Sequence, residues 1–452
     1  MLSLLCKGEL MNNSTNQSLK PVSIKVNDIN VLEIGGCSMT DLAEKYNTPL
    51  YVLDEATIRS ICNDYKDAFK AYKNIRMLYA SKALCTMAVS KILTQEGFGF
   101  DVVSAGEIYT VFKSGADMST VLFNGNNKSY EELSLAIELG VGRISVDNFF
   151  ELSLLNEVAA SYGKVVNVLL RITPGIECHT HEYIQTGHLD SKFGFDLTQV
   201  DEAVDLILNS YKNLNLKGIH AHIGSQIFET SVYGDEIEIL IKELVRINEK
   251  FGLNLNEINA GGGLGVKYVQ NDCPPSTYEI AGVIIDRLND CIKKYNIEPP
   301  VIYIEPGRSI ISTAGVTLYT VGSSKQVPKG KKYFAVDGGM SDNIRPSMYE
   351  AQYEAQIANK PDESLCENVT IAGRFCESGD ILIKDIKLPK LEEGDILCVY
   401  NTGAYNYSMA SNYNRVQKPA MVLVNNSQSD IIIKRETLDD VVSHDVIPDR
   451  LI

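Results

Sequence analysis

An alternation of short apolar runs with longer amphipathic runs, from about residue 75 to residue 307, constrains the fold more than any other feature of this chain. Apolar residues recur every three or four places in the longer runs, as in surface helices, whereas the short runs are typical of buried strands. Eight strands are expected, at residues 75–81, 97–104, 121–125, 143–148, 166–172, 217–224, 257–263 and 301–307. Eight strand–helix units over roughly 230 residues predict an α/β fold with a closed (β/α)8 TIM-type barrel, and an open doubly wound sheet is the alternative.

After residue 310 the pattern changes to short, alternating runs that are rich in β-branched residues. These runs predict a second, mostly β domain, of the sandwich or barrel type, and residues 22–34 also have the character of a strand. The expected organisation is a disordered lead over 1–20, a strand segment over 21–46 that joins the β domain, the barrel over 47–310 and the C-terminal β domain over 311–452.

Composition narrows the classes of partner and compartment. The chain has 452 residues, with 42 Lys and Arg against 58 Asp and Glu, and its net charge of −16 disfavours nucleic acid and anionic membranes. No apolar run approaches the length of a membrane span, and the apolar opening of the chain lacks the basic start of a signal peptide. The ten cysteines include no Cys-x-x-Cys pair, so reduced thiols in the cytoplasm are expected.

The first expected strand ends on a lysine. Lys82 follows an apolar run and is flanked by the small residues Ala80, Ser81 and Ala83. Burial lowers the pKa of such an amine, so that its neutral form can attack a carbonyl group. The alternative is a structural lysine whose stem lies along the strand end while its charge reaches water.

Other polar clusters also follow the expected strands, where the loops of barrel enzymes carry the active site. Gly261, Gly262 and Gly263 allow backbone N–H groups to approach an anion, although three glycines also suit an ordinary tight turn. Ser225 can add a hydroxyl group to a phosphate site. Glu305 ends the last expected strand, where a carboxylate suits a cationic nitrogen of a ligand.

His220 and His222 lie two residues apart on one strand and therefore share a face. A metal pair is the first interpretation, and Cys178, His179, His181 and His188 are candidates to complete it. Neighbouring strands offer no carboxylate or thiol at ligand spacing, so no metal is expected. His222 can instead stack against an aromatic ligand.

A lysine, a stacking histidine, a phosphate cradle and a carboxylate at one barrel mouth meet the four needs of pyridoxal 5'-phosphate. In this interpretation Lys82 forms the Schiff base and His222 covers the ring. Ser225 and Gly261–Gly263 hold the phosphate, and Glu305 keeps the pyridine nitrogen protonated. The combination is far more specific than any of its parts.

Seven motifs, in order, resemble those of fold-type III pyridoxal-phosphate decarboxylases over about residues 40–425. They are Tyr79-Ala80-Ser81-Lys82-Ala83, His220-Ala221-His222-Ile223-Gly224-Ser225-Gln226, Gly261-Gly262-Gly263, Glu305-Pro306-Gly307-Arg308, Asp337-Gly338-Gly339-Met340, Cys376-Glu377-Ser378-Gly379-Asp380 and Gly403-Ala404-Tyr405. Within that group, Thr186-Gly187, Asp190-Ser191-Lys192-Phe193-Gly194 and Asn343-Ile344-Arg345-Pro346 with Tyr349 are most similar to the diaminopimelate decarboxylases. One departure is Leu84-Cys85, where many members have a polar Asn.

The resemblance implies decarboxylation of meso-2,6-diaminopimelate to L-lysine and CO2, the last step of lysine biosynthesis. Catalytic roles are implied for Lys82, His222 and Cys376, of which Cys376 is the proton donor. Cofactor contacts are implied for Lys82, His222, Ser225, Gly261, Gly262, Gly263, Glu305, Arg308 and Tyr405. Substrate contacts are implied for Arg308, Arg345, Tyr349, Glu377 and Tyr405.

The family's enzymes are head-to-tail homodimers, in which Cys376 and Glu377 would be lent to the neighbour's site. The alternative within the fold is a decarboxylase of ornithine, lysine or arginine. Such an enzyme needs an acidic residue where Arg308 and Arg345 are expected to point, whereas a substrate with a second carboxylate suits arginines as bidentate donors.

Overall fold

The computed structural model describes residues 13–175 and 191–452, which divide into two compact units. The first unit contains residues 13–17, 59–175, 191–266 and 273–310. The second contains residues 18–58, 267–272 and 311–452.

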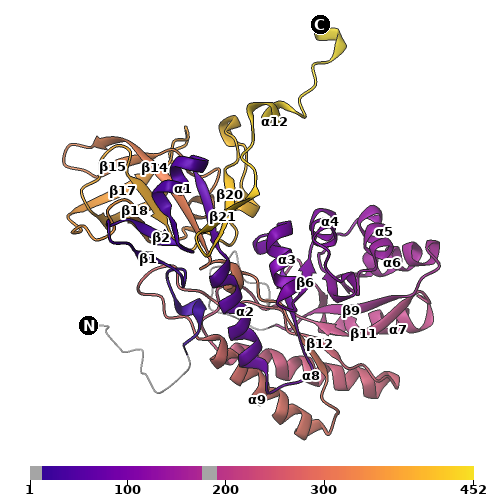
Figure 1. Cartoon of the computed structure of the whole chain (residues 1–452). Coiled ribbons are helices and arrows are strands. Elements are labelled where there is room, and N and C mark those ends of the chain that lie inside the picture. The colour runs from indigo at the N-terminus through magenta and orange to yellow at the C-terminus, as the bar shows by residue number, and fades with distance from the viewer. Residues whose placement is uncertain (1–12, 176–190) are drawn as a thin grey trace. The chain divides into compact units, whose positions relative to one another are not determined.

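Eight parallel strands of the first unit close into a barrel (Figure 1). They are β5 Ile75–Ala80, β6 Gly99–Val102, β7 Val121–Phe123, β8 Arg143–Val146, β9 Val166–Thr173, β11 Leu214–His220, β12 Glu257–Asn259 and β13 Val301–Ile304. Because β13 pairs with β5 and β8 pairs with β9, the sheet has no free edge among these strands. The barrel predicted from sequence is confirmed, and the open doubly wound sheet is excluded. A short strand, β10 Phe195–Asp196, adds to β9.

Helices cover the outside of the barrel (Figure 1). They are α3 Met87–Gln95, α4 Ala105–Lys113, α5 Tyr130–Leu139, α6 Phe149–Ser161, α7 Val200–Asn209, α8 Ser231–Phe251 and α9 Thr277–Tyr295. Local sequence explains where several of them begin, since Ser129 with Glu132 and Ser276 with Glu279 form capping boxes. Each capping box fixes the residue at which a helix begins. It therefore also fixes the length of the loop between that helix and the preceding strand, at the barrel mouth.

The barrel interior is layered. An apolar layer contains Leu78, Leu122 and Leu169, with Tyr303 packed against them. Residues two places further along a strand point to the same side. Asn124 follows Leu122, Arg171 follows Leu169 and Glu305 follows Tyr303 in this way, and all three of these polar residues are buried. The carboxyl ends of the strands therefore place a polar layer directly above the apolar one.

The second unit is built on a nine-stranded sheet, which confirms the predicted mostly β domain. Its strands are β4 Leu50–Asp54, β14 Gly315–Gln326, β15 Lys332–Val336, β16 Ala355–Ile357, β17 Glu367–Ala372, β18 Ile381–Leu388, β19 Ile396–Val399, β20 Ala420–Asn425 and β21 Gln428–Ile433. All five residues of β4 are buried, and it lies between β14 and β20. Helix α2 Glu55–Phe69 connects β4 to the barrel along the chain.

The N-terminal part of the second unit forms a small sheet of its own. It consists of β1 Lys25–Val26, β2 Leu32–Ile34 and β3 Cys37–Ser38, and α1 Met39–Tyr46 follows. The backbone N–H of Leu32 donates to the carbonyl oxygen of Ala358, 2.8 Å away, and so connects this sheet to the rest of the unit.

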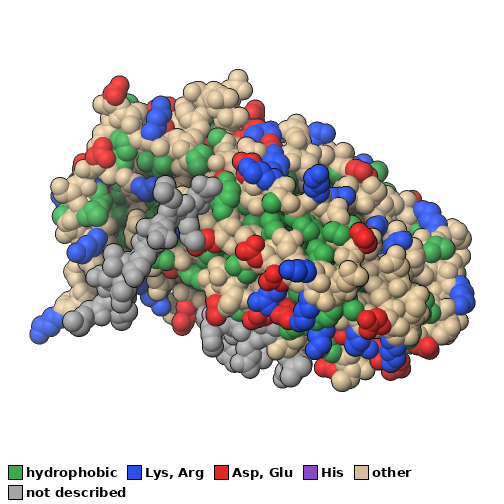
Figure 2. Space-filling model, turned by 90° about the horizontal axis from the view of Figure 1, so that it is seen from below, with side chains coloured by type: hydrophobic (Ala, Val, Ile, Leu, Met, Phe, Trp, Pro, Cys, Tyr) green, Lys and Arg blue, Asp and Glu red, His purple; other side chains and the backbone are tan. Residues whose placement is uncertain are grey.

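The surface carries charged side chains of both signs, and the described helices show no membrane span, as the composition led us to expect. Within residues 13–175 and 191–452, no helix has both the length and the apolar character that a membrane crossing requires. On the face seen in Figure 2, Lys and Arg side chains are interspersed with Asp and Glu side chains. The negative net charge is therefore not gathered into one acidic patch on this face.

Candidate active site

Lys82 lies at the carboxyl end of β5, in a single helical turn over Ser81–Ala83. Its side chain is half-buried. Burial raises the pKa values of the nearby Asp101 and Glu107 carboxyl groups, and the positive charge of Lys82 opposes this rise. The amine therefore belongs to a group of titratable side chains at the barrel mouth.

Glu305 follows β13 and is buried at the centre of this group. Its Oε1 accepts hydrogen bonds from Nδ2 of Asn259 at 2.6 Å and from Nδ2 of Asn124 at 3.4 Å. Its Oε2 lies 3.6 Å from Nε2 of His220. Burial alone would raise the pKa of Glu305, but the neighbouring basic groups, His220 first among them, outweigh burial and hold this pKa below its ordinary value. Glu305 therefore remains an anion.

Asp101, on β6, is a second buried carboxyl group with the opposite character. The Nδ2 of Asn124 donates to its Oδ1 at 2.6 Å, so one amide contacts both Asp101 and Glu305. Burial, followed by the negative charge of Glu305, raises the pKa of Asp101 well above its ordinary value. The pKa of Asp101 is therefore raised and that of Glu305 is lowered, although both carboxyl groups contact the same amide.

Burial lowers the pKa values of both histidines, one on β11 and one in the loop that follows it. His220 is buried, its Nδ1 lies 2.8 Å from Oγ of Ser145, and burial lowers its pKa. His222 accepts a hydrogen bond at Nδ1 from the backbone N–H of Gly262 at 3.2 Å, and burial followed by the charge of Lys82 lowers its pKa well below 6.5. A neutral ring attached to the triple glycine is suited to stacking.

The triple glycine forms a cradle beside a hydroxyl and a guanidinium group. Gly261 and Gly263 have φ values of +57° and +123°, which favour glycine. A Cβ atom at Gly262 or Gly263 would come within 2.1 or 2.7 Å of a neighbouring carbonyl oxygen. Oγ of Ser225 accepts hydrogen bonds from Nε and Nη2 of Arg308 at 3.2 and 3.1 Å. A glycine backbone, a hydroxyl group and a guanidinium group together suit a phosphate.

A second group of predicted residues meets within the β unit. The Nε of Arg345 donates to the hydroxyl of Tyr353 at 3.0 Å, and its guanidinium lies 5.8, 5.3 and 5.7 Å from the ring centroids of Tyr268, Tyr349 and Tyr405. Arg345 is 8% exposed, and among the described residues no carboxylate forms an ion pair with it. A buried guanidinium held by tyrosines can still bind a carboxylate of a ligand.

Cys376 and Glu377 belong to the same unit as this tyrosine cluster. Both are exposed on the loop after β17, where the backbone N–H of Cys376 donates to Oδ1 of Asn414 at 3.3 Å. In the described part of the chain, no hydrogen bond or ion pair joins either residue to Arg345. The structure thus brings together the predicted residues of each unit, except these two.

The departure at Leu84-Cys85 is accommodated by packing. Leu84 is buried, and burial raises the pKa of the Cys85 thiol to about 12. The thiol also interacts with the hydroxyl groups of Thr110 and Ser81. Cys85 therefore stays protonated and serves as a small, weakly polar side chain beside Lys82.

Several residues considered in the sequence fall outside the described ranges. They are Cys178, His179, His181, Thr186, Gly187, His188 and Asp190. Within the described ranges, no group of three or more His, Cys, Asp or Glu side chains is arranged to hold a metal ion.

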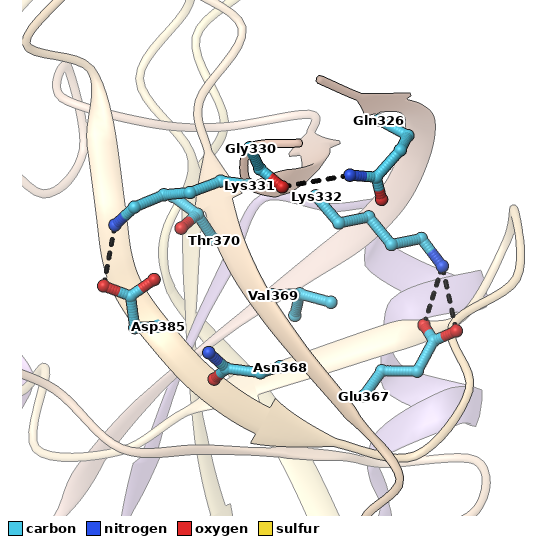
Figure 3. Close-up of a pocket in the computed structure, with 9 residues that line it drawn as sticks. All are labelled: Gln326, Gly330, Lys331, Lys332, Glu367, Asn368, Val369, Thr370 and Asp385. Atoms are coloured by element: carbon cyan, nitrogen blue, oxygen red, sulfur yellow. Dashed lines mark hydrogen bonds and ion pairs between the residues drawn. The ribbon is translucent and has the colours of Figure 1, made fainter. Parts of the chain in front are cut away.

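A polar pocket on the β unit is not part of either group (Figure 3). Its lysines are already paired, Lys331 with Asp385 at 2.7 Å and Lys332 with Glu367 at 2.9 Å. A further pocket lies at the amino ends of the barrel strands, opposite the end that carries Lys82. None of the residues predicted for the site lines either pocket.

Comparison with known proteins assigns the family. Residues 55–312 match the model of a family described as "Pyridoxal-dependent decarboxylase, pyridoxal binding domain". A diaminopimelate decarboxylase of Synechocystis sp. is 47% identical over 449 residues, covering 97% of this chain and 95% of that relative. One of Bacillus subtilis is 48% identical over 418 residues, covering 92% and 95%. This chain belongs to the diaminopimelate decarboxylase family.

A solved structure supports the assignment to the diaminopimelate decarboxylase family. The crystal structure of diaminopimelate decarboxylase from M. jannaschii in complex with L-lysine has a TM-score of 0.90 and 36% identity, covering 96% of this chain and 100% of that chain. The barrel mouth also fits the cofactor that gives the family model its name. It offers an amine at Lys82, an anion at Glu305 and a glycine cradle at Gly261–Gly263.

Sequence reasoning missed several residues that shape the site of this family member. Asn124 and Asn259 donate hydrogen bonds to Glu305, and Asp101 shares the Asn124 amide with it. In the structure each of them lies within one residue of the carboxyl end of its strand, whereas the predicted strands 97–104 and 257–263 extended well past Asp101 and Asn259. Tyr268 and Tyr353 have no local signal, because each reaches Arg345 through folding of the β unit.

Proposed function

We propose that this chain catalyses pyridoxal-phosphate-dependent decarboxylation of meso-2,6-diaminopimelate to L-lysine and CO2 in the cytoplasm. The observation that carries the choice of substrate is Arg345, a buried guanidinium without an ion pair among the described residues. The eight cysteines of the described ranges are all free thiols, in keeping with a reducing compartment.

The cofactor would be held by residues of the barrel mouth, each at a different part of the molecule. Lys82 would bind the aldehyde carbon, His222 the ring face, Glu305 the ring nitrogen, and Ser225, Gly261–Gly263 and Arg308 the phosphate. When bound, pyridoxal phosphate supplies an electron sink for the electron pair left by the departing CO2.

Glu305 and Asp101 are two carboxyl groups with different roles at the barrel mouth. Glu305 is an anion and can hold a proton on a cationic nitrogen that faces it. Burial and the charge of Glu305 raise the pKa of Asp101, which disfavours a second negative charge that would compete for that proton. Asn124 and Asn259 keep the Glu305 carboxylate oriented through their amide N–H groups.

Specificity would come from the far end of the substrate, which carries both a carboxylate and an ammonium group. Arg345 provides charge-assisted hydrogen bonds for the carboxylate, and its tyrosine neighbours restrict the rotation of the guanidinium. Glu377 provides a negative charge for the ammonium. A diamine-forming decarboxylase would instead need a carboxylate near the position of Arg345.

Cys376 would donate the proton to the α-carbon, and the active enzyme would be a head-to-tail homodimer. Both Cys376 and Glu377 are exposed, and in the described residues neither is bonded to the tyrosine cluster of its own chain. Exposure leaves them available to a second copy, which would lend them to its neighbour's site. The dimer and the assignment of individual site residues are part of the proposal.

A substrate panel with an Arg345 variant tests this function. The protein with pyridoxal phosphate should release CO2 from meso-diaminopimelate and not from ornithine, lysine or arginine. Arg345→Ala should raise KM for diaminopimelate on the order of 100-fold, the loss expected for charge-assisted hydrogen bonds of about 3 kcal/mol.

Arg246→Ala is the control, because Arg246 is a half-buried arginine of the barrel unit whose charge is already paired with Asp201 and Glu243. Its KM should equal that of the unmodified enzyme. CO2 release from ornithine in place of diaminopimelate, or an unchanged KM in Arg345→Ala, would refute the proposal.

A further inference from the structure

Asp380 places one buried carboxylate between two loops of the β unit. It is 3% exposed, its Oδ1 accepts a hydrogen bond from the backbone N–H of Met340 at 2.7 Å, and its Oδ2 accepts one from Phe375 at 2.8 Å. Met340 belongs to the loop that leads to Arg345. Phe375 directly precedes Cys376. A single side chain therefore connects the loop of the substrate arginine with the loop of the proton donor.

Backbone hydrogen bonds also hold the loop around Asp380 together. Its carbonyl oxygen accepts from the N–H of Gly373 at 2.9 Å, and its own N–H donates to the carbonyl oxygen of Glu377 at 3.1 Å. The N–H of Arg374 donates to the carbonyl oxygen of Gly338 at 3.0 Å. The segment 373–380 is thus bound at both ends and also to the neighbouring loop.

Two glycines make room for the carboxylate. A Cβ atom at Gly339 would lie 2.5 Å from Oδ1 of Asp380, and one at Gly373 would lie 2.1 Å from Oδ2. Gly339 also has a φ of +155°, whereas no positive φ is found at Gly373. An alanine at Gly373 therefore conflicts with the Asp380 side chain and not with its own backbone.

A further hydrogen bond joins the two loops independently of the Asp380 side chain. The hydroxyl of Ser347, on the short helix that begins at Arg345, donates to the carbonyl oxygen of Gly379 at 2.7 Å. The loop that carries Cys376 is exposed at its tip, so these bonds at its base determine where the tip lies.

We infer that Asp380 is a positioning residue, which fixes the Cys376 loop against the Gly338–Met340 loop so that the Cys376 thiol is presented in the geometry that proton donation requires. Asp380 acts through Cys376 and does not itself touch the substrate. The inference rests on the proposed function, because Cys376 donates a proton to the α-carbon only if the chain is the proposed decarboxylase.

Asp380→Asn is the first test. The amide oxygen can accept one backbone N–H, but its NH2 group faces the other N–H and repels it. In the holoenzyme, kcat should fall about tenfold, the loss expected when a general acid is misplaced. The absorbance of bound cofactor should not change. Asp385→Asn, the same substitution at an exposed position of β18, should leave kcat unchanged.

Gly373→Ala breaks the same contact from the other side and should lower kcat similarly. Its control is Gly322→Ala, where an added Cβ lies 3.6 Å from the nearest atom, an ordinary contact. Two variants with different chemistry keep the test decisive if one of them fails to fold.

A double-mutant comparison separates positioning from general damage. In a Cys376→Ala background, Asp380→Asn should change the residual kcat by less than about twofold, because the group it positions is absent. If the double variant instead lost kcat by the product of the two single-variant losses, the inference would be overturned. An unchanged kcat in both Asp380→Asn and Gly373→Ala would also overturn it.

If the unmodified enzyme releases no CO2 from diaminopimelate, the proposed function fails, and Asp380 is tested by another readout. The rate of Cys376 alkylation by iodoacetamide in the holoenzyme, followed by mass spectrometry, should change about tenfold or more in Asp380→Asn when the loop is released. It should stay constant in Asp385→Asn. Equal rates in all three proteins would overturn the positioning role.

Discussion

Replacing Lys128 by Met should destabilise the barrel strongly. Lys128 follows β7 and is 4% exposed. Its Nζ donates to Oε1 of Glu151 at 2.6 Å and to the carbonyl oxygens of Gly125 and Ser145, both at 2.8 Å. All three ammonium protons are therefore used, and they connect the loop after β7 with β8 and with α6.

The size of the effect follows from the burial of the pair. Both side chains are 2% exposed, so removing Lys128 leaves the Glu151 carboxylate without its cation in a desolvated position. Breaking a buried ion pair in this way costs about 3–5 kcal/mol. Glu151 would keep its hydrogen bond from the backbone N–H of Asp147 at 3.0 Å, which supports the lower part of that range.

Urea unfolding followed by circular dichroism measures this change in the free energy of unfolding. The double variant Lys128→Met with Glu151→Leu should recover much of the loss, because no unpaired charge remains. Lys250→Met, which removes an exposed ion pair with Asp201, should cost less than about 1 kcal/mol. A cost below 1 kcal/mol for Lys128→Met, or additive losses in the double variant, would refute the reasoning.

Two further predictions concern assembly and pH. The inactive Lys82→Ala protein and the Cys376→Ala protein, which keeps only a small residual activity, should regain about a quarter of full activity when they are mixed and exchange subunits, because half of the dimers are mixed and each has one intact site. Demonstrated exchange without recovery would show that each site is made within one chain. Burial raises the pKa of Asp342 from 3.8 to about 7, so between these pH values the folded state keeps a proton that the unfolded state has lost. The free energy of unfolding should therefore fall as pH rises through that window, by up to about 1.4 kcal/mol per pH unit, and it should fall less steeply in Asp342→Asn. Urea unfolding at several pH values measures this dependence. The same slope in both proteins would contradict the prediction.

The barrel could be predicted from sequence because each of its strand–helix units is encoded locally. Lys82, Glu305 and Gly261–Gly263 were predicted for the same reason, since a closed barrel brings all strand ends to one mouth. The pairing of β4 could not be predicted in this way. Its five buried residues suit a barrel strand equally well, and only its long-range neighbours β14 and β20 place it in the β unit.

The details of the site depended more on long-range contacts. Arg345 was predicted from its motif, but its neighbour Tyr268 lies in a short segment that crosses into the β unit, with no local signal of that role. The protonation of Asp101 and Glu305 at the barrel mouth could not be predicted from sequence either. Nothing in the sequence distinguishes the raised pKa of Asp101 from the lowered pKa of Glu305, because burial and the charges of neighbouring groups decide these directions.

The central claim, that Lys82 at the barrel mouth holds the aldehyde of pyridoxal phosphate, is tested most directly by borohydride reduction of the holoenzyme followed by peptide mass mapping. The reduced cofactor should be found on Lys82 and be absent from Lys82→Ala, which should also lose activity. Lys91→Ala, at an exposed lysine of the following helix, should behave like the unmodified enzyme. A cofactor adduct on a different lysine, or full activity in Lys82→Ala, would contradict the account.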